Sequence, residues 1–401
     1  MVIDNGFEKS ANYANVIARL GISHAEYLSL IKSVKKVFPQ AWVSEELAKY
    51  DKMYPPVFRH NLLPGLFSRL QYNSIPMTLG GICGGEIALV PMIRLGQLIQ
   101  TMEGEMGAKR LFKRLRGGPV DYMSARFELE VLESFKSAGY SIKKAMEADG
   151  VDFTFEKNNR EILVEATHRG ASWILDLVDK IFQKSFTRGF QGHSNRSVRL
   201  KLKYKNKIGY YTDVVVEKIV HKIVETSHGF SEGFDDPKGN YSILVEKYEK
   251  GNSLAIECYD LGEFVYEAIE LFKSKLQDEQ KLKQLLKNPG TYCAVDTRSL
   301  MPCILAGKDD NSYNVSSKIL RGWLSYASEF LRKHPDVGGI FIWVCHVGRV
   351  KDLIVDNMDQ NEIILVNAPH HLSEEEASQL FPFAKLTKDL SWYHGNADNS
   401  A

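Results

Sequence analysis

The sequence predicts an α/β protein whose mixed central sheet is flanked by helices, with a mainly helical region before this core and an α+β segment inserted into it. Residues 126–168 read as a helix, a turn and a strand hairpin, and residues 291–345 read as strand, helix and strand. The residues between these parts are too many for a loop and predict an insertion. We expect a helical region (1–120), two core halves (121–186 and 291–370), an insertion (187–290) and a C-terminal extension (371–401).

Composition is that of an ordinary globular protein. The 401 residues are 44% hydrophobic and 25% charged, with a net charge of +1 that neither favours nor excludes nucleic acid. The five cysteines are scattered without a CxxC pair, which suits a reducing compartment and offers no zinc site. No apolar run reaches the roughly 18 residues needed to span a membrane, and the N-terminus does not read as a signal peptide. A cytoplasmic protein without a membrane partner is expected.

The N-terminal region predicts helices at about 23–37, 44–52 and 92–115, the first opened by a Ser23–Glu26 capping box. The glycine cluster at 80–85 lacks a following Lys-Ser/Thr, so a turn is favoured over a nucleotide site. The basic helix end at 109–116 has two explanations, which are the helix dipole and a contact to phosphate.

A carboxylate is expected on the buried face of the helix within 126–139. Counting from Glu128, the i+3, i+4 and i+7 positions are apolar (Val131, Leu132 and Phe135). Glu130 and Glu133 are expected to face solvent, and Gly139 is expected to close the helix. A buried carboxylate requires a partner or a bound cation.

The following hairpin brings two further carboxylates together. Asp152 lies in the strand 150–155, residues 156–159 form the tip, and the return strand 161–167 carries Glu165. Strand alternation places Glu165 and Thr167 on one face, and adjacency places Asp152 close to Glu165. Such oxygens suit Mg²⁺.

These residues resemble the PD-(D/E)xK nuclease superfamily, which has the restriction-endonuclease-like fold. Glu128, Asp152 and Glu165 match its helix glutamate, strand aspartate and D/E-x-K acid, and Thr167 stands at the lysine position as E-x-T. The resemblance implies a nuclease in which the three acids hold Mg²⁺ or Mn²⁺. Its substrate is nucleic acid, with DNA favoured over RNA but RNA left open, and nucleases of this class often serve in defence against foreign DNA. One alternative is a catalytically silent protein of this fold that binds nucleic acid or a partner protein. Another is that Glu128 is only a paired core charge.

A replacement for the missing lysine is expected from the predicted helix 172–186, where Lys180 is the first candidate beside Lys184 and Gln183. These residues are equally explained as the solvated side of that helix. Thr167 can hydrogen-bond a water but carries no charge. His168 is expected on the face opposite Glu165.

A regular row of cations in the insertion predicts a track for phosphates of nucleic acid. Its members alternate with other residues: Arg199, Lys201, Lys203, Lys205 and Lys207. Lysines also protect edge strands from aggregation, so both explanations stay open. A homo-oligomer is compatible with the sequence.

The rest of the chain predicts the elements of the insertion and of the second core half. These are helices at 213–226, 261–286 and 316–333, and strands at 241–246, 253–258, 292–296, 338–345 and, at the sheet edge, 363–366. The strand 338–345 is continuously apolar and is expected to be covered on both faces. Asp296 is expected to cap the turn after its strand rather than to join the site.

Overall fold

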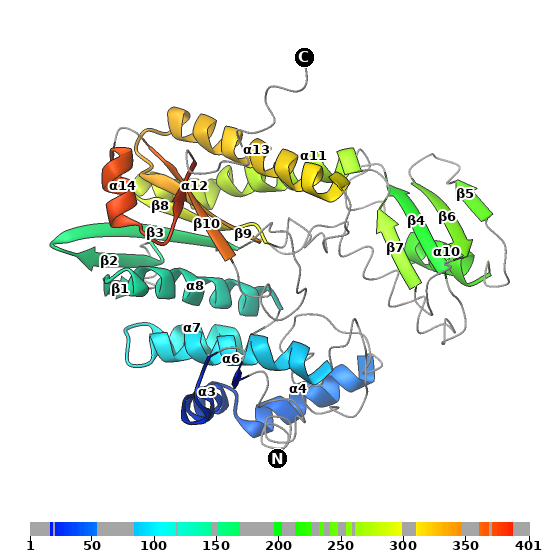
Figure 1. Cartoon of the computed structure of the whole chain (residues 1–401), viewed down its shortest axis with the longest axis horizontal. Coiled ribbons are helices and arrows are strands. Elements are labelled where there is room, and N and C mark those ends of the chain that lie inside the picture. The colour runs from blue at the N-terminus through cyan, green and yellow to red at the C-terminus, as the bar shows by residue number, and fades with distance from the viewer. Residues whose placement is uncertain are drawn as a thin grey trace. The chain divides into compact units, whose positions relative to one another are not determined.

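The structure is a computed structural model, and Figure 1 shows its helices and strands. The described residues are 17–18, 21–53, 84–117, 119–145, 151–168, 196–202, 213–225, 232–235, 241–247, 254–258, 261–298, 310–345, 361–368 and 371–387. Within these ranges, no helix has both the length and the apolar character that crossing a membrane requires.

The chain divides into two compact units. Unit 1 contains residues 1–170, 275–298 and 324–401, and unit 2 contains residues 171–274 and 299–323. Unit 2 therefore includes most of the segment that the sequence sets apart at 187–290. Residues 275–290 belong to unit 1 instead.

Unit 1 is built on a mixed sheet of seven strands flanked by helices, as the sequence predicts. Its order is β1 (Ser141–Ala145), β2 (Phe153–Lys157), β3 (Arg160–His168), β8 (Tyr292–Asp296), β9 (Gly339–Cys345), β10 (Asn361–Asn367) and β11 (Lys385–Leu386). The pairs β3–β8, β8–β9 and β10–β11 are parallel, and the other pairs are antiparallel. The expectation that β10 forms the sheet edge is wrong, because the short β11 pairs with its outer side.

The helices of unit 1 precede, connect or follow these strands. They are α3 (His24–Val37), α4 (Gln40–Met53), α6 (Gly84–Met102), α7 (Ala108–Leu115), α8 (Pro119–Ser137), α12 (Glu279–Lys287) and α14 (Glu374–Leu380). The Ser23 side chain accepts a hydrogen bond from the Glu26 amide, so the predicted start of α3 is confirmed. Gly139 follows α8 with a φ of 86°, the left-handed conformation expected of a glycine that ends a helix.

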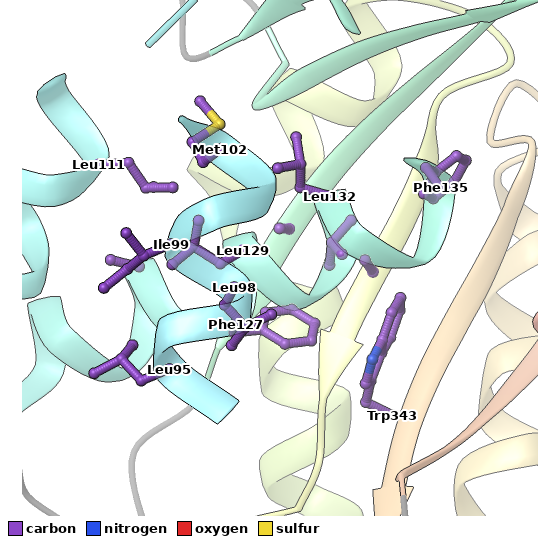
Figure 2. Close-up of a cluster of buried hydrophobic side chains, with 14 of the residues drawn as sticks. Leu95, Leu98, Ile99, Met102, Leu111, Phe127, Leu129, Leu132, Phe135 and Trp343 are labelled. Atoms are coloured by element: carbon purple, nitrogen blue, oxygen red, sulfur yellow. The ribbon is translucent and has the colours of Figure 1, made fainter. Parts of the chain in front are cut away.

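Helix α8 lies between the sheet and the N-terminal helices α6 and α7 (Figure 1). On the sheet side, the Phe135 ring stacks on Phe155 with centroids 4.2 Å apart, and Phe127 meets Trp343 edge-on at 5.2 Å. On the other side, apolar residues of α6 and α7 pack against α8, as Figure 2 shows for Leu98, Ile99 and Leu129. Burial on two sides leaves residues 127–132 of α8 entirely buried.

Helix α13 (Asp310–Lys333) connects β8 to β9 and confirms the predicted crossover between parallel strands. From Leu324 onward α13 covers the sheet face opposite α8 (Figure 1), with Leu324, Ala327 and Leu331 buried. Residues 340–344 of β9 are all buried, so the expectation of a strand covered on both faces is confirmed.

Unit 2 contains a second sheet of four strands with the order β5-β6-β4-β7. The described elements of unit 2 are β4 (Arg196–Leu202), α10 (Asp213–Glu225), β5 (Glu232–Asp235), β6 (Tyr241–Lys247), β7 (Leu254–Cys258), most of α11 (Leu261–Leu276) and residues 310–323 of α13. The prediction of one long helix at 261–286 is wrong. α11 ends at Leu276, and Asp278 starts α12 as its N-cap.

Candidate active site

The β2–β3 hairpin brings Asp152 and Glu165 together. Asn158 and Asn159 form its two-residue turn with φ values of 53° and 60°, as a tight hairpin turn requires. The resulting register pairs Phe153 with Val164, which places Asp152 beside Glu165. The Asp152 amide donates to Glu165 Oε2 at 3.3 Å, and the Ala166 amide donates to Asp152 Oδ2 at 2.9 Å. The two predicted carboxylates are therefore neighbours, and each accepts a hydrogen bond from a backbone amide on the other arm of the hairpin.

A lysine from α12 joins this pair. The Lys281 ammonium donates hydrogen bonds to Glu165 Oε1 and, at 3.3 Å, to the Ala166 carbonyl, and it lies 3.9 Å from Asp152 Oδ2. The Asp278 side chain caps the helix by accepting from the Lys281 amide at 3.1 Å, which fixes the backbone from which the lysine reaches. Lys281 thus brings a positive charge to the acids from a segment that the sequence prediction did not single out.

Burial and neighbouring charges together shift the pKa values of Glu165 and Lys281. Glu165 is only 1% exposed, and burial, reinforced by the charge of Asp152, raises the pKa of its carboxyl to about 7 despite the opposing Lys281. Burial alone would lower the pKa of Lys281, but the carboxylates of Asp152 and Glu165 outweigh it and raise that pKa. Near neutral pH, Lys281 is therefore charged while Glu165 can gain or lose a proton.

Glu128 approaches the same region from α8. It is buried, as the sequence predicts, and its Oε2 accepts a hydrogen bond from Arg114 Nη1 of α7 at 2.6 Å. Burial and the nearby charge of Asp152 raise the pKa of Glu128 to about 7, against the opposing influence of Arg114 and Lys281. Glu128 and Asp152 therefore interact electrostatically.

The oxygen atoms around the Lys281 ammonium form a donor set that a hard divalent cation also prefers. They comprise the carboxylates of Asp152 and Glu165 and the carbonyl of Ala166. Within the described ranges, no three His, Cys, Asp or Glu side chains are arranged to hold a metal ion. The donor chemistry fits Mg²⁺, while Lys281 itself neutralises these acceptors.

Cys293 is the residue of β8 that pairs with Glu165 of β3. Burial, followed by the charge of Glu165, raises the pKa of its thiol to about 12. A thiol that stays protonated is a poor ligand for a hard cation, since the thiolate is the ligand form. The carboxylates remain the better metal ligands.

The structure describes the residue at the lysine position but not the replacements that the sequence predicts. Thr167 is buried on β3, two residues beyond Glu165. Lys180, Lys184 and Gln183 lie outside the described residues. The sequence signal that could have found Lys281 is the break before α12, where Asp278 and Glu279 are typical of a new helix start.

A second ionic cluster contains His168, Asp296, Arg298 and Glu130. His168 Nδ1 lies 2.9 Å from Asp296 Oδ2, and Arg298 Nε and Nη2 donate to Asp296 at 2.7 and 2.8 Å. Burial opposes ionisation of Asp296, but Arg298 and His168 more than compensate and hold its pKa well below the ordinary range. Asp296 also accepts from the Arg298 amide at 3.1 Å, which matches the predicted turn cap.

The expectation that Glu130 faces solvent is wrong. Glu130 is 3% exposed, and its Oε2 lies 2.6 Å from Arg298 Nη2. Apolar spacing within α8 could not predict Arg298, which reaches Glu130 from the end of β8. Glu133 is half-buried and pairs with Arg94 of α6.

The expected phosphate track lies partly in β4. Arg199 and Lys201 occupy alternate positions of that strand, while Lys203, Lys205 and Lys207 lie outside the described residues. β4 pairs with β6 on one side and with β7 on the other. Protection of a sheet edge therefore does not explain Arg199, which is paired on both sides, whereas the pairing with β7 ends at Leu200.

Comparisons with protein-family models, curated proteins and solved structures find no match to this chain. Its function is therefore inferred from the geometry of the site.

Proposed function

We propose that the chain is a metal-dependent nuclease that hydrolyses phosphodiester bonds of nucleic acid, with DNA favoured over RNA. One observation carries the proposal: the Lys281 ammonium lies against Glu165 and the Ala166 carbonyl, with Asp152 3.9 Å away. The E-x-T sequence lacks a positive charge at Thr167, and Lys281 supplies one beside the same acids. Two acids and a lysine at one point are a combination suited to phosphoryl chemistry.

Asp152, Glu165 and the Ala166 carbonyl are the groups that would hold Mg²⁺ or Mn²⁺. A bound divalent ion would polarise the phosphate and lower the pKa of an attacking water. Glu128 has its pKa raised to about 7, first by burial, so it can accept or release a proton near neutral pH. Lys281 can orient a water or stabilise negative charge on the phosphate, and Arg114 holds the Glu128 carboxylate in place.

The test is cleavage by the full-length protein. Supercoiled plasmid, linear duplex DNA and RNA are incubated with Mg²⁺, with Mn²⁺ or with chelator. We expect metal-dependent cleavage that Asp152→Asn and Glu165→Gln each reduce by at least about 100-fold, as loss of a principal catalytic group does. Glu161→Gln, an exposed carboxylate on the same strand, is the matched control and should cleave normally. Cleavage that persists in both site variants contradicts the proposal.

The second candidate is a catalytically silent protein of the same fold that binds nucleic acid or a partner protein. It is favoured because Lys281 already neutralises the Glu165 carboxylate that would hold a metal ion. It is also favoured by the lack of a three-ligand metal cluster within the described ranges. Calorimetric titration with Mn²⁺ separates the two candidates. A nuclease site should take up Mn²⁺ in the wild type and lose it in Asp152→Asn, whereas a silent site should show no uptake in either.

A further inference from the structure

Helix α7 presents a continuous cationic surface. Lys109, Lys113 and Arg116 are exposed, and at 3.6 residues per turn they point within about 60° of one another. We call these three residues the α7 basic face. Arg110 and Arg114 extend it to an arc of about 160° around the helix axis. Arg114 lies at the end of this arc that adjoins the buried side of α7.

The arc leads toward the carboxylates, because Arg114 Nη1 donates to Glu128 Oε2 at 2.6 Å. Glu128 in turn interacts electrostatically with Asp152. One helix therefore carries cations from the exposed surface of unit 1 to an acid of the candidate active site. This placement distinguishes the α7 basic face from a scattered set of surface charges.

The helix dipole does not account for this arrangement. Lys113 and Arg114 lie in the last turn, where the dipole favours cations, but Lys109 and Arg110 lie in the first turn, where it disfavours them. The helix itself contains no acidic residue.

Neighbouring acids do not neutralise the surface either. The two acids of the loop before α7, Glu103 and Glu105, pair with Lys36 and Lys136 instead. Among the described residues, no carboxylate forms an ion pair with the α7 basic face. Three exposed cations thus remain available to an anionic partner.

The apolar side of α7 indicates the class of that partner. Leu111 and Leu115 are fully buried in the core, as Figure 2 illustrates for Leu111. A helix that binds in a bilayer surface must insert an apolar face, and α7 has already buried its own. A polyanion recognised through exposed cations fits better, and regularly spaced phosphates provide one.

We infer that the α7 basic face binds the phosphodiester backbone of a nucleic acid and leads it past Arg114 to Glu128, Asp152 and Glu165. The direction of this path rests on the proposed nuclease function, whereas binding itself does not. Each lysine or arginine that neutralises a phosphate contributes about 0.9 to the slope of log affinity against log salt on duplex DNA. Three such contacts contribute about 2.7.

The test uses the full-length protein and a fluorescently labelled DNA duplex in chelator, so that binding is measured without cleavage. The variant is Lys109→Gln/Lys113→Gln/Arg116→Gln. Its matched control is Lys287→Gln/Arg332→Gln/Lys333→Gln, which removes the same charge from exposed positions of unit 1 on α12 and α13. Dissociation constants are measured by anisotropy over a salt series, and circular dichroism checks that all three proteins are folded.

We expect the α7 variant to bind at least about 10-fold more weakly at low salt, with a salt slope reduced by about 2 to 3, while the control stays near the wild type. This result supports the inference even where the wild type cleaves nothing. A slope equal to that of the control overturns it, and a wild type that cleaves normally then leaves the nuclease proposal standing. Phosphatidylserine vesicles are the second probe, and loss of vesicle binding with duplex binding intact also overturns it.

Discussion

The Lys281 ammonium contacts the Glu165 carboxylate although 116 positions separate the two residues in the chain. The meeting follows from the sheet topology, because β8 directly follows α12 and pairs in parallel with β3, with Cys293 opposite Glu165. A lysine that precedes β8 is therefore placed over the strand that carries the acid. This contact brings a positive charge to the two acids of the hairpin.

Replacing Lys281 should remove the positive charge without removing the carboxylates. We expect Lys281→Gln to lower kcat for plasmid cleavage by at least about 100-fold, since an oriented charge at a reacting phosphate contributes several kcal/mol. The pKa of Glu165 should rise above about 7, because Lys281 is the group that now opposes the effect of burial. The pH–rate profile measures this shift. Lys283→Gln, on the exposed side of α12, should leave kcat unchanged.

Moving the lysine from α12 to β3 tests whether cleavage requires Lys281 itself or only a positive charge beside Glu165. Thr167 is buried two residues after Glu165, on the same face of the strand. Thr167→Lys combined with Lys281→Gln should recover at least about 10-fold of the cleavage lost in Lys281→Gln alone. In the wild-type background, Thr167→Lys should lower activity, because two ammonium groups would compete for one carboxylate. Equal activity of the double and single variants would contradict this prediction.

Glu128 should make stability depend on pH. Its pKa rises from 4.5 to about 7 on folding, first because of burial, so the folded state binds more protons between these values. The free energy of unfolding should therefore fall as pH rises from about 4.5 to about 7, by up to about 3 kcal/mol. Glu128→Gln should remove the part of the fall that Glu128 causes and leave the part from Glu165, whose pKa burial also raises to about 7, as measured by urea unfolding at pH 4.5 and pH 8. Glu161→Gln is the exposed control, and an identical fall in both variants would exclude Glu128 as the source.

The buried ionic cluster around Asp296 should contribute to the stability of the fold rather than to catalysis. Arg298→Met leaves Asp296 and Glu130 without their shared arginine and should cost about 3–5 kcal/mol of unfolding free energy. Asp296 has a depressed pKa, so its contribution is present above the unfolded value of 3.8 and disappears as pH falls through the folded value. The difference between wild type and variant in urea unfolding should thus be larger at pH 7 than in strong acid. Arg332→Met, exposed on α13, is the control.

From the sequence alone, the features that could be predicted are those set within a single segment of the chain. Strand alternation predicted the hairpin and the meeting of Asp152 with Glu165. The predicted tip at 156–159 is wrong, because Glu156 and Lys157 belong to β2 and the turn consists of Asn158 and Asn159. Helical spacing likewise identified Glu128 as buried. These features are local, since a period of two or of 3.6 residues is a property of a single segment.

The distant partners of the buried carboxylates depend on the tertiary structure and could not be predicted from the sequence. Glu130, which the helical period of α8 assigns to solvent, is buried where Arg298 from the end of β8 reaches its carboxylate. Lys281 reaches Glu165 because α11 ends at Leu276 and a new helix, α12, begins at its N-cap Asp278 and leads into β8. The physical reason is the same in both cases. A segment's hydrophobic period reports that one face is buried, whereas the partner of a buried charge depends on the order of strands in the sheet and on which helices cover them.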